Sequence, residues 1–433
     1  SFIPDMFWDK KYMSDPTVLK WQIRMIRYLV NLCKDYDNVI AWGLGNENNC
    51  GTDSASRDEA WLWTATIADA IRACDNEKPI ISGMHGLSVV SYGNNKWFFR
   101  DQGESNDILT IHPYPYYTPH CNRDKLTSLR TILHSESESV LTSDIGGKPC
   151  LTQELGVLGP MIGNEERSGK YVESVMWSVW TSGDLGTIWW MAFDSDTYET
   201  PYDWQATERE LGFMDINRKP RPVVLAMNDF KKALSDLPQD YQILPKRKSD
   251  VVCILPYYQD SWTVVYSAYI LSKQTGFDLC FTDSESKLPE STFYMLPSIK
   301  GVNSISKRKW DELLGKVKDG ASLYISFSNV SMSSFKDIVG LEVVEREIRT
   351  SNYKIPTVDK VISFPVMKDG KEEPYKFDFI NVGAEIILTE EDHNPFLVKN
   401  KYGKGTIYTL FAGIEVISSY KQGAFDDGVN DFS

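Results

Sequence analysis

The feature that most constrains the fold is a series of short apolar segments that alternate with helical segments between residues 16 and 236. Short apolar runs are typical of buried strands, and apolar residues at helical spacing are typical of the helices that cover them. Strands and helices that alternate in this way predict a parallel α/β fold. The expected strands are 39–47, 79–84, 107–112, 149–154 and 187–193, and the expected helices are 16–36, 57–75, 165–182 and 222–236.

Polar side chains stand at the carboxyl ends of several of these strands. Asn46 and Glu47 end the first strand, His112 ends the third, and Glu154 ends the fourth. In (β/α)8 barrels the active site lies on this face, in the loops that follow the strands. Five strands do not close a barrel, and an open arc would leave an unpaired edge. We therefore expect a TIM barrel in which three further βα units precede Ser1.

The pair Glu47 and Glu154 indicates a chemistry that neither residue indicates alone. A single glutamate at a strand end is usually a surface residue. Two of them on one barrel face match the requirement of retaining glycoside hydrolysis, in which one carboxyl protonates the leaving oxygen. The other attacks the sugar from a carboxyl separation of about 5–5.5 Å.

Composition excludes several classes of function. The formal charge of −14 argues against a nucleic-acid partner, which requires a basic surface. No apolar run approaches the ~20 residues of a membrane span. The seven cysteines are irregularly spaced and include no zinc-binding pattern, and no other metal or cofactor is expected. Localisation stays open between a periplasmic or secreted protein whose signal has been removed and a cytoplasmic one.

A chain of 433 residues is expected to form two domains. Residues 1–240 would form the barrel, and 237–248 read as a linker. Residues 241–425 would form a second, doubly wound α/β domain, and 426–433 the start of a further segment or a truncated end. The expected strands of this second domain are 251–255, 277–281, 294–297 and 321–327. Its expected helices are 261–275 and 306–319, and extended pieces follow at 377–382 and 406–411.

The first domain resembles the clan A retaining glycoside hydrolases, closest to the cellulases, mannanases and β-mannosidases. The resemblance runs from Phe7 to about Lys232. It rests on Ile40-Ala-Trp-Gly-Leu-Gly-Asn-Glu47, His112-Pro-Tyr114, Thr152-Gln-Glu-Leu-Gly156, and Trp189-Trp190 followed by Glu210-Leu-Gly. It places Glu47 and Glu154 on the fourth and seventh strands of the barrel.

The resemblance implies that Glu47 is the general acid/base and that Glu154 is the nucleophile. It also implies that Asn46 binds the sugar 2-hydroxyl and that Trp190 forms the platform under the cleaved sugar. Tyr114 can donate a hydrogen bond that keeps Glu154 ionised, while the neighbouring carboxylate and partial burial should raise the pKa of Glu47.

Other readings of the same side chains remain open. His112 is either a site residue or a core histidine, and Trp190 either binds sugar or fills the barrel, with Trp189 as the alternative platform. His85 and Trp8 are further candidates for substrate binding. Asp194 and Asp196 are candidates for sugar hydroxyls or solvated loop residues.

The second domain resembles the glutamine-amidotransferase-like domain that follows the barrel in some β-galactosidases and β-mannosidases. A working amidotransferase needs a Gly-x-Cys-x-Gly elbow, and this chain has Tyr324-Ile-Ser-Phe-Ser-Asn-Val-Ser instead. We therefore expect a non-catalytic domain. The resemblance implies that it assembles a homo-oligomer, as in relatives that form trimers.

These observations favour a retaining β-glycosidase that acts on a carbohydrate substrate, with a β-mannosidase preferred. The alternatives are a β-galactosidase or β-glucosidase, an endo-acting mannanase or cellulase of the same clan, and a carbohydrate-binding protein on an inactive barrel.

Overall fold

The computed structural model describes residues 4–51, 54–86, 96–195, 206–244, 246–358, 360–366 and 374–426. Their contacts divide the chain into two compact units. Unit 1 holds the chain up to Thr118 together with Thr131–Arg247, and unit 2 holds Pro119–Arg130 and the chain from Lys248 onward. The expected boundary at 240/241 falls within a short helix of unit 1, and the assignment of 119–130 to unit 2 was not anticipated. No helix in the described part of the chain combines the length and apolar character needed to cross a bilayer.

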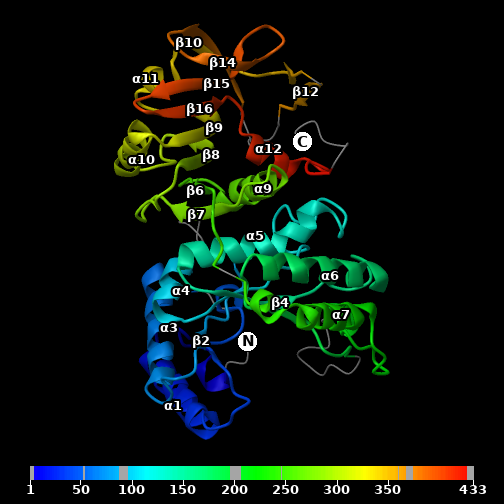
Figure 1. Cartoon of the computed structure of the whole chain (residues 1–433). Helices are drawn as coiled ribbons and strands as arrows, with labels where there is room; N and C mark the ends of the chain where they lie inside the picture. The colour runs from blue at the N-terminus through cyan, green and yellow to red at the C-terminus, as the bar shows by residue number, and fades with distance from the viewer. Residues whose placement is uncertain are drawn as a thin grey trace. The chain divides into compact units, whose positions relative to one another are not determined.

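Unit 1 is built on five parallel strands that follow one another in chain order, with β2 and β4 labelled in Figure 1. A parallel bridge between Ile81 and Ile108 connects the pair β1–β2 to the trio β3–β4–β5. Within the described residues, β1 and β5 each pair with one neighbour, so these strands form an arc. The strands are β1 (Trp42–Gly43), β2 (Ile80–Ile81), β3 (Leu109–Ile111), β4 (Cys150–Leu155) and β5 (Thr187–Trp189).

Helices connect these strands in the expected alternation, and capping residues fix where they begin. Asp15 accepts hydrogen bonds from the first turn of α1, where Pro16 occupies the first helical position. Ser56 and Asn164 cap α3 and α6 in the same way. The helices are α1 (Pro16–Cys33), α2 (Asn48–Gly51), α3 (Arg57–Arg72), α4 (Phe99–Ser105), α5 (Leu129–Gly146), α6 (Glu165–Thr181), α7 (Pro222–Asp236) and α8 (Gln239–Gln242), with 3-10 turns η1 (Asp5–Phe7) and η2 (Ala206–Glu210).

The first strand is much shorter than the predicted span 39–47, which is corrected here to two residues. Backbone bonds from Leu44 to Ile81 and from Glu47 to Gly83 continue the pairing beyond it, but the chain no longer runs straight. Gly45 and Gly83 approach so closely that a Cβ on Gly83 would lie 2.1 Å from the Gly45 carbonyl oxygen. This close approach turns the chain before Glu47, because only glycine leaves room for it.

Unit 2 contains a seven-stranded sheet in the order β14-β15-β16-β9-β8-β6-β7. Five of its strands, β16-β9-β8-β6-β7, are parallel, with β6 between β7 and β8, which is the doubly wound arrangement expected from the sequence. Its strands are β6 (Val251–Leu255), β7 (Leu279–Asp283), β8 (Phe293–Gly301), β9 (Ser322–Val330), β14 (Glu385–Thr389), β15 (Pro395–Tyr402) and β16 (Gly405–Leu410).

Smaller elements complete unit 2. The pairs β10–β13 and β11–β12 are antiparallel, and they supply order where the sequence indicated only extended pieces. These elements are β10 (Leu341–Ile348), β11 (Tyr353–Pro356), β12 (Val361–Phe364), β13 (Tyr375–Asn381), α9 (Ser261–Gln274), α10 (Lys307–Asp319), α11 (Phe335–Val339) and α12 (Ile414–Tyr420).

The segment 119–130 is held within unit 2 by the buried side chain of Arg130. Its guanidinium pairs with Asp124 and donates to the carbonyl oxygens of Ser418, Ser419 and Lys421 at 2.7–3.2 Å. It also lies 4.7 Å from the centre of the Phe425 ring. A buried arginine with this many acceptors fixes the position of the segment, because each acceptor would otherwise lack a partner.

Arg130→Met should therefore destabilise unit 2. The change leaves the Asp124 carboxylate buried without its cation, and breaking such a pair costs about 3–5 kcal/mol. Guanidinium denaturation should show the loss as a lower unfolding midpoint. Lys307→Met is the matched control, since Lys307 pairs with Asp311 on the exposed surface of α10 and should change the midpoint little. Equal midpoints for the two variants would contradict the assigned role of Arg130.

Candidate active site

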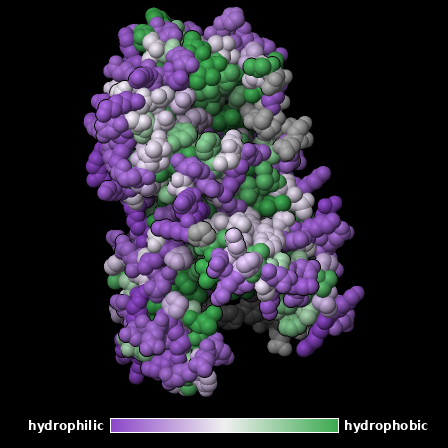
Figure 2. Space-filling model, viewed as in Figure 1, coloured by the Kyte–Doolittle hydropathy of each residue, from purple (hydrophilic) through white to green (hydrophobic). Residues whose placement is uncertain are grey.

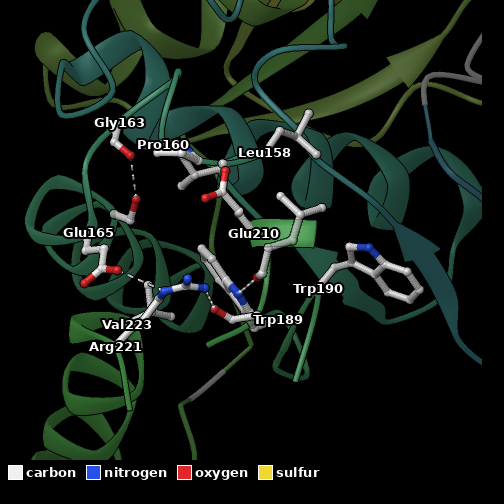
Figure 3. Close-up of a pocket in the computed structure, with 14 residues that line it drawn as sticks. Leu158, Pro160, Gly163, Glu165, Trp189, Trp190, Glu210, Arg221 and Val223 are labelled. Atoms are coloured by element: carbon white, nitrogen blue, oxygen red, sulfur yellow. Dashed lines mark hydrogen bonds and ion pairs between the residues drawn. The ribbon is translucent and has the colours of Figure 1, made fainter. Parts of the chain in front are cut away.

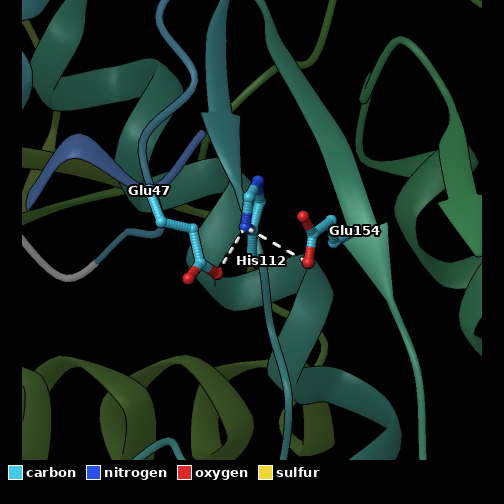
Figure 4. Close-up of side chains that lie close together, drawn as sticks. All are labelled: Glu47, His112 and Glu154. Carbon is cyan, nitrogen blue, oxygen red and sulfur yellow. Dashed lines mark hydrogen bonds and ion pairs between the residues drawn. The ribbon is translucent and has the colours of Figure 1, made fainter. Parts of the chain in front are cut away.

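His112 lies between Glu47 and Glu154 and contacts both (Figure 4). Its Nδ1 atom is 2.8 Å from Glu47 Oε1 and 3.5 Å from Glu154 Oε2. One oxygen of each carboxylate and the imidazole nitrogen all lie within 4.8 Å of one another. The two glutamates predicted from the strand ends are therefore brought together by one side chain.

The loop after β1 gives Glu47 an unusual backbone. Its φ of 50° lies in the left-handed region, and its backbone N–H donates to the Gly83 carbonyl at 2.8 Å. Helix α2 begins at the next residue. The Glu47 side chain is 31% exposed and so can reach a ligand, while His112 is fully buried.

Tyr114 supports the second carboxylate. Its hydroxyl donates to Glu154 Oε2 at 2.7 Å, as the sequence suggested. Gly156 makes this approach feasible, since a Cβ there would lie 2.9 Å from the Tyr114 ring. In the described part of the chain, no arginine or lysine pairs with Glu154. The Glu154 side chain is 12% exposed and is thus more buried than that of Glu47.

The pKa shifts of the two glutamates are opposite to those expected from the sequence. The hydrogen bond from His112 holds the pKa of Glu47 below its ordinary value, although partial burial opposes it. Burial raises the pKa of Glu154, and the nearby His112 and Tyr114 offset this only in part. Sequence reasoning predicted the opposite pattern, because it considered the two carboxylates and did not foresee that the histidine bonds to Glu47.

The charge of His112 accounts for the lowered pKa of Glu47. Burial lowers the pKa of His112, but the Glu47 hydrogen bond and the charges of both carboxylates outweigh burial, so the pKa is raised overall. A protonated imidazole next to Glu47 stabilises the ionised form of that carboxylate. Glu47, His112 and Glu154 also have the spacing of a metal site, and the 2.8 Å hydrogen bond between His112 and Glu47 already engages two of the three.

Asn46, His85 and Trp8 were also predicted to bind substrate. Asn46 is exposed next to Glu47. The His85 ring centre is 6.0 Å from that of His112, and Asn49 holds the His85 backbone by a 2.9 Å hydrogen bond. Trp8 is 75% exposed and directly follows η1.

The two tryptophans of β5 are distinguished by their environments. Trp189 is buried and donates to the Leu211 carbonyl, whereas Trp190 is 38% exposed and donates to Glu208 at 3.0 Å. Both tryptophans line a pocket that also includes Glu165 and Arg221. Figure 3 shows the Trp190 indole directed away from Glu165 and Arg221. Trp190 is thus the more exposed of the two rings.

Asp194 and Asp196 were candidates either for binding sugar hydroxyls or for a solvated loop. Asp194 is engaged by Arg221 through two bonds of 2.6 and 2.7 Å, and it accepts the Gly212 N–H, so it holds the loop together. Asp196 lies outside the described residues.

Sequence reasoning did not identify Gln153 and Asn49 as members of the site. Gln153 Oε1 lies 3.3 Å from His112 Nε2, on the side of the ring opposite Glu47. Strand alternation should send Gln153 and Glu154 to opposite faces, so the sequence gave no reason to include both. Asn49 follows Glu47 within α2, and its position in a short helix carried no distinguishing pattern.

Unit 2 contains no nucleophile elbow in its described residues. Strand β9 continues through the position at which the elbow was sought, and Ser326 and Tyr324 there bond to the buried carboxylate of Glu415. Burial raises the pKa of the Cys253 thiol well above its ordinary value, which disfavours the reactive thiolate.

Comparison with known proteins finds no matching family model and no matching curated protein, but it finds solved structures with the same fold. An exo-β-1,4-mannosidase from Opitutaceae bacterium strain TAV5 is 18% identical over 98% of this chain and 77% of its own, with a TM-score of 0.74. A β-galactosidase from Bacillus circulans sp. alkalophilus is 12% identical over 96% and 73%, with a TM-score of 0.67. A GH5_18 protein from Streptomyces cattleya in complex with GlcNAc is 16% identical over 66% and 72%, with a TM-score of 0.56.

Glu154→Gln should stabilise the protein at neutral pH. The pKa of Glu154 is raised in the folded state, so its ionisation opposes folding once the pH exceeds the unfolded-state value. The penalty is absent at more acidic pH and is complete above the folded-state pKa. Thermal unfolding should therefore show a higher midpoint for the variant at pH 7 and a smaller difference near pH 4.

The matched control for this measurement is Glu173→Gln, on the exposed face of α6. It should show no gain at pH 7. A Glu154→Gln variant that is less stable than the parent at pH 7 would contradict the burial argument.

The structures that share this fold over nearly the whole chain show that the chain has a TIM-barrel-type fold followed by an α/β unit, as expected from the sequence.

Proposed function

We propose that the protein is a retaining glycoside hydrolase that cleaves β-linked sugars by double displacement. The observation that carries the proposal is the approach of one Glu47 oxygen and one Glu154 oxygen to within 4.8 Å. Retaining enzymes hold their carboxyl groups about 5–5.5 Å apart, whereas inverting enzymes need about 6.5–9.5 Å to admit a water molecule. A protein that only binds carbohydrate has no need of this spacing.

The proposed roles follow from the surroundings of each carboxylate. Glu154 attacks the anomeric carbon, with the Tyr114 hydroxyl stabilising its ionised form. Glu47, which is more exposed, protonates the leaving oxygen and later activates water. Asn46 beside it binds the 2-hydroxyl, and Trp190 supplies the apolar face on which the sugar ring stacks.

A β-mannoside is the proposed substrate class. The likeness to an exo-β-1,4-mannosidase supports it, because it extends over 98% of this chain. A β-galactoside is the second candidate, supported by the likeness to a β-galactosidase over 96% of the chain. The mechanism proposed for Glu47 and Glu154 applies to either sugar.

Assembly of several copies through unit 2 is part of the proposal. Figure 2 shows apolar side chains on the surface in the region where Figure 1 labels β10 and β14. Val344 and Ile348 of β10 and Ile386 of β14 are exposed. Exposed apolar surface of this kind is typical of interfaces between protein chains.

The function is tested by incubating the full-length protein with aryl β-glycosides of the manno, gluco, galacto and fuco series. We expect turnover that is fastest with the mannoside, and proton NMR should show the β anomer as the first product, because two displacements retain configuration. A first product of inverted configuration would contradict the retaining mechanism. Absence of turnover on every sugar would contradict the proposed function.

Alanine variants should distinguish the nucleophile from the acid. Glu154→Ala should abolish turnover, and azide should restore it as the α-glycosyl azide, because the small anion occupies the space of the lost carboxylate. Glu47→Ala should lose about 10²–10⁴-fold on substrates with poor leaving groups and much less on dinitrophenyl glycosides. A β-glycosyl azide from Glu154→Ala would reverse the two roles.

A further inference from the structure

Gln153 and Glu154 are adjacent in β4, yet both contact the ring of His112. In a regular strand, neighbouring side chains point to opposite faces. The pairing of β4 with β5 explains the exception. Thr152 pairs with Thr187 and Leu155 pairs with Trp189. Between these two pairs, β4 advances by three residues and β5 by two. The extra residue is a β-bulge, which redirects the side chains beside it.

The contact of Gln153 constrains the protons on His112. With its amide in this orientation, Gln153 places Oε1 3.3 Å from His112 Nε2, where an oxygen accepts from the Nε2–H tautomer. A neutral His112 then has no hydrogen on Nδ1. The 2.8 Å contact between Nδ1 and Glu47 Oε1 must therefore contain a proton that belongs to one of the two atoms.

The pair His112–Glu47 consequently holds one mobile proton in either of two forms. An imidazolium faces a carboxylate, or a neutral imidazole faces a carboxylic acid, and the net charge is zero in both. The raised pKa of His112 and the lowered pKa of Glu47 favour the first form in the free protein. Glu47 acts as an acid only in the second form.

We propose that Gln153 is a positioning residue that fixes the Nε2–H form of His112, so that the imidazole stores the proton of the general acid. This inference rests on the proposed glycosidase function. In the glycosylation step, the proton moves from Nδ1 to the Glu47 carboxylate, and Glu47 transfers a proton to the leaving oxygen as the glycosidic bond breaks and the bond to Glu154 forms. In the second step, Glu47 removes a proton from water as the water oxygen bonds to the anomeric carbon and the bond to Glu154 breaks, so a proton returns to the His112–Glu47 pair.

The charged groups around His112 come from several elements. Glu47 and Cys50 belong to the loop after β1 and to α2, His85 follows β2, Tyr114 follows β3, and Glu154 is in β4. Of these groups, Glu154 raises the pKa of His112 and His85 lowers that of Glu47. Among the residues that the structure describes, Gln153 is the one with a hydrogen-bond contact to Nε2, so a change at this position tests the tautomer selectively.

Two substitutions of Gln153 should move the pH profile in opposite directions. For the full-length protein, Gln153→Glu adds a negative charge beside Nε2–H, so it should stabilise the imidazolium and shift the basic limb of kcat/KM to higher pH. Gln153→Leu removes the acceptor and should shift that limb to lower pH. One hydrogen bond corresponds to about 0.5–1 pH unit.

Substrate choice and a control variant isolate the effect. With dinitrophenyl glycosides, which need little acid assistance, neither variant should shift the basic limb. Gln239→Leu, at an exposed position of α8, should leave every profile unchanged. Shifts in the same direction for both Gln153 variants, or unaltered limbs with uniformly lower kcat, would mean that Gln153 merely supports the strand and would overturn the proposal.

A second measurement does not depend on turnover. In protein with ¹⁵N-labelled histidine, the chain has five imidazole rings, and the His112 signals are those lost in His112→Asn. We expect neutral His112 to carry its hydrogen on Nε2 in the parent and on Nδ1 in Gln153→Leu. An Nδ1–H ring in the parent would overturn the proposal. If no glycoside is turned over, the proposed function fails while this result still decides the tautomer.

Discussion

The site depends on the fully buried imidazole of His112, which reaches a carboxylate on either side. Burial without such partners would leave two ring nitrogens unsatisfied, which proteins rarely tolerate. Glu47, Glu154 and Gln153 meet that requirement, and the ring in turn fixes the distance between the two carboxylates. One histidine thus determines both the spacing and the charge of the pair.

The backbone around His112 is adapted to this arrangement at two points. The left-handed conformation of Glu47, made accessible by the close approach of Gly45 and Gly83, directs its side chain towards the ring. The bulge in β4 directs Gln153 and Glu154 to the same side. Both are departures from regular strand geometry next to the proposed site, where backbone irregularities in proteins are concentrated.

Much of the architecture was predictable because apolar periodicity reports burial. The order of strands and helices, the pairing of Glu47 with Glu154, and the Tyr114 contact were all anticipated from residue patterns. The pKa pattern was not, since it depends on which carboxylate the histidine bonds. Gln153 was missed because a bulge is a tertiary feature. The segment 119–130 was missed because Arg130 reads as a solvated residue, and its acceptors lie 288–291 residues away.

That separation has a consequence for how the protein is made. Ribosomes add about 5–20 residues per second, so roughly 15–60 s pass between synthesis of Arg130 and synthesis of its last acceptors. Throughout this interval, the segment 119–130, which comes shortly after His112 and Tyr114 in the chain, lacks these partners. The segment 119–130 therefore reaches its final structure only after helix α12 has left the ribosome.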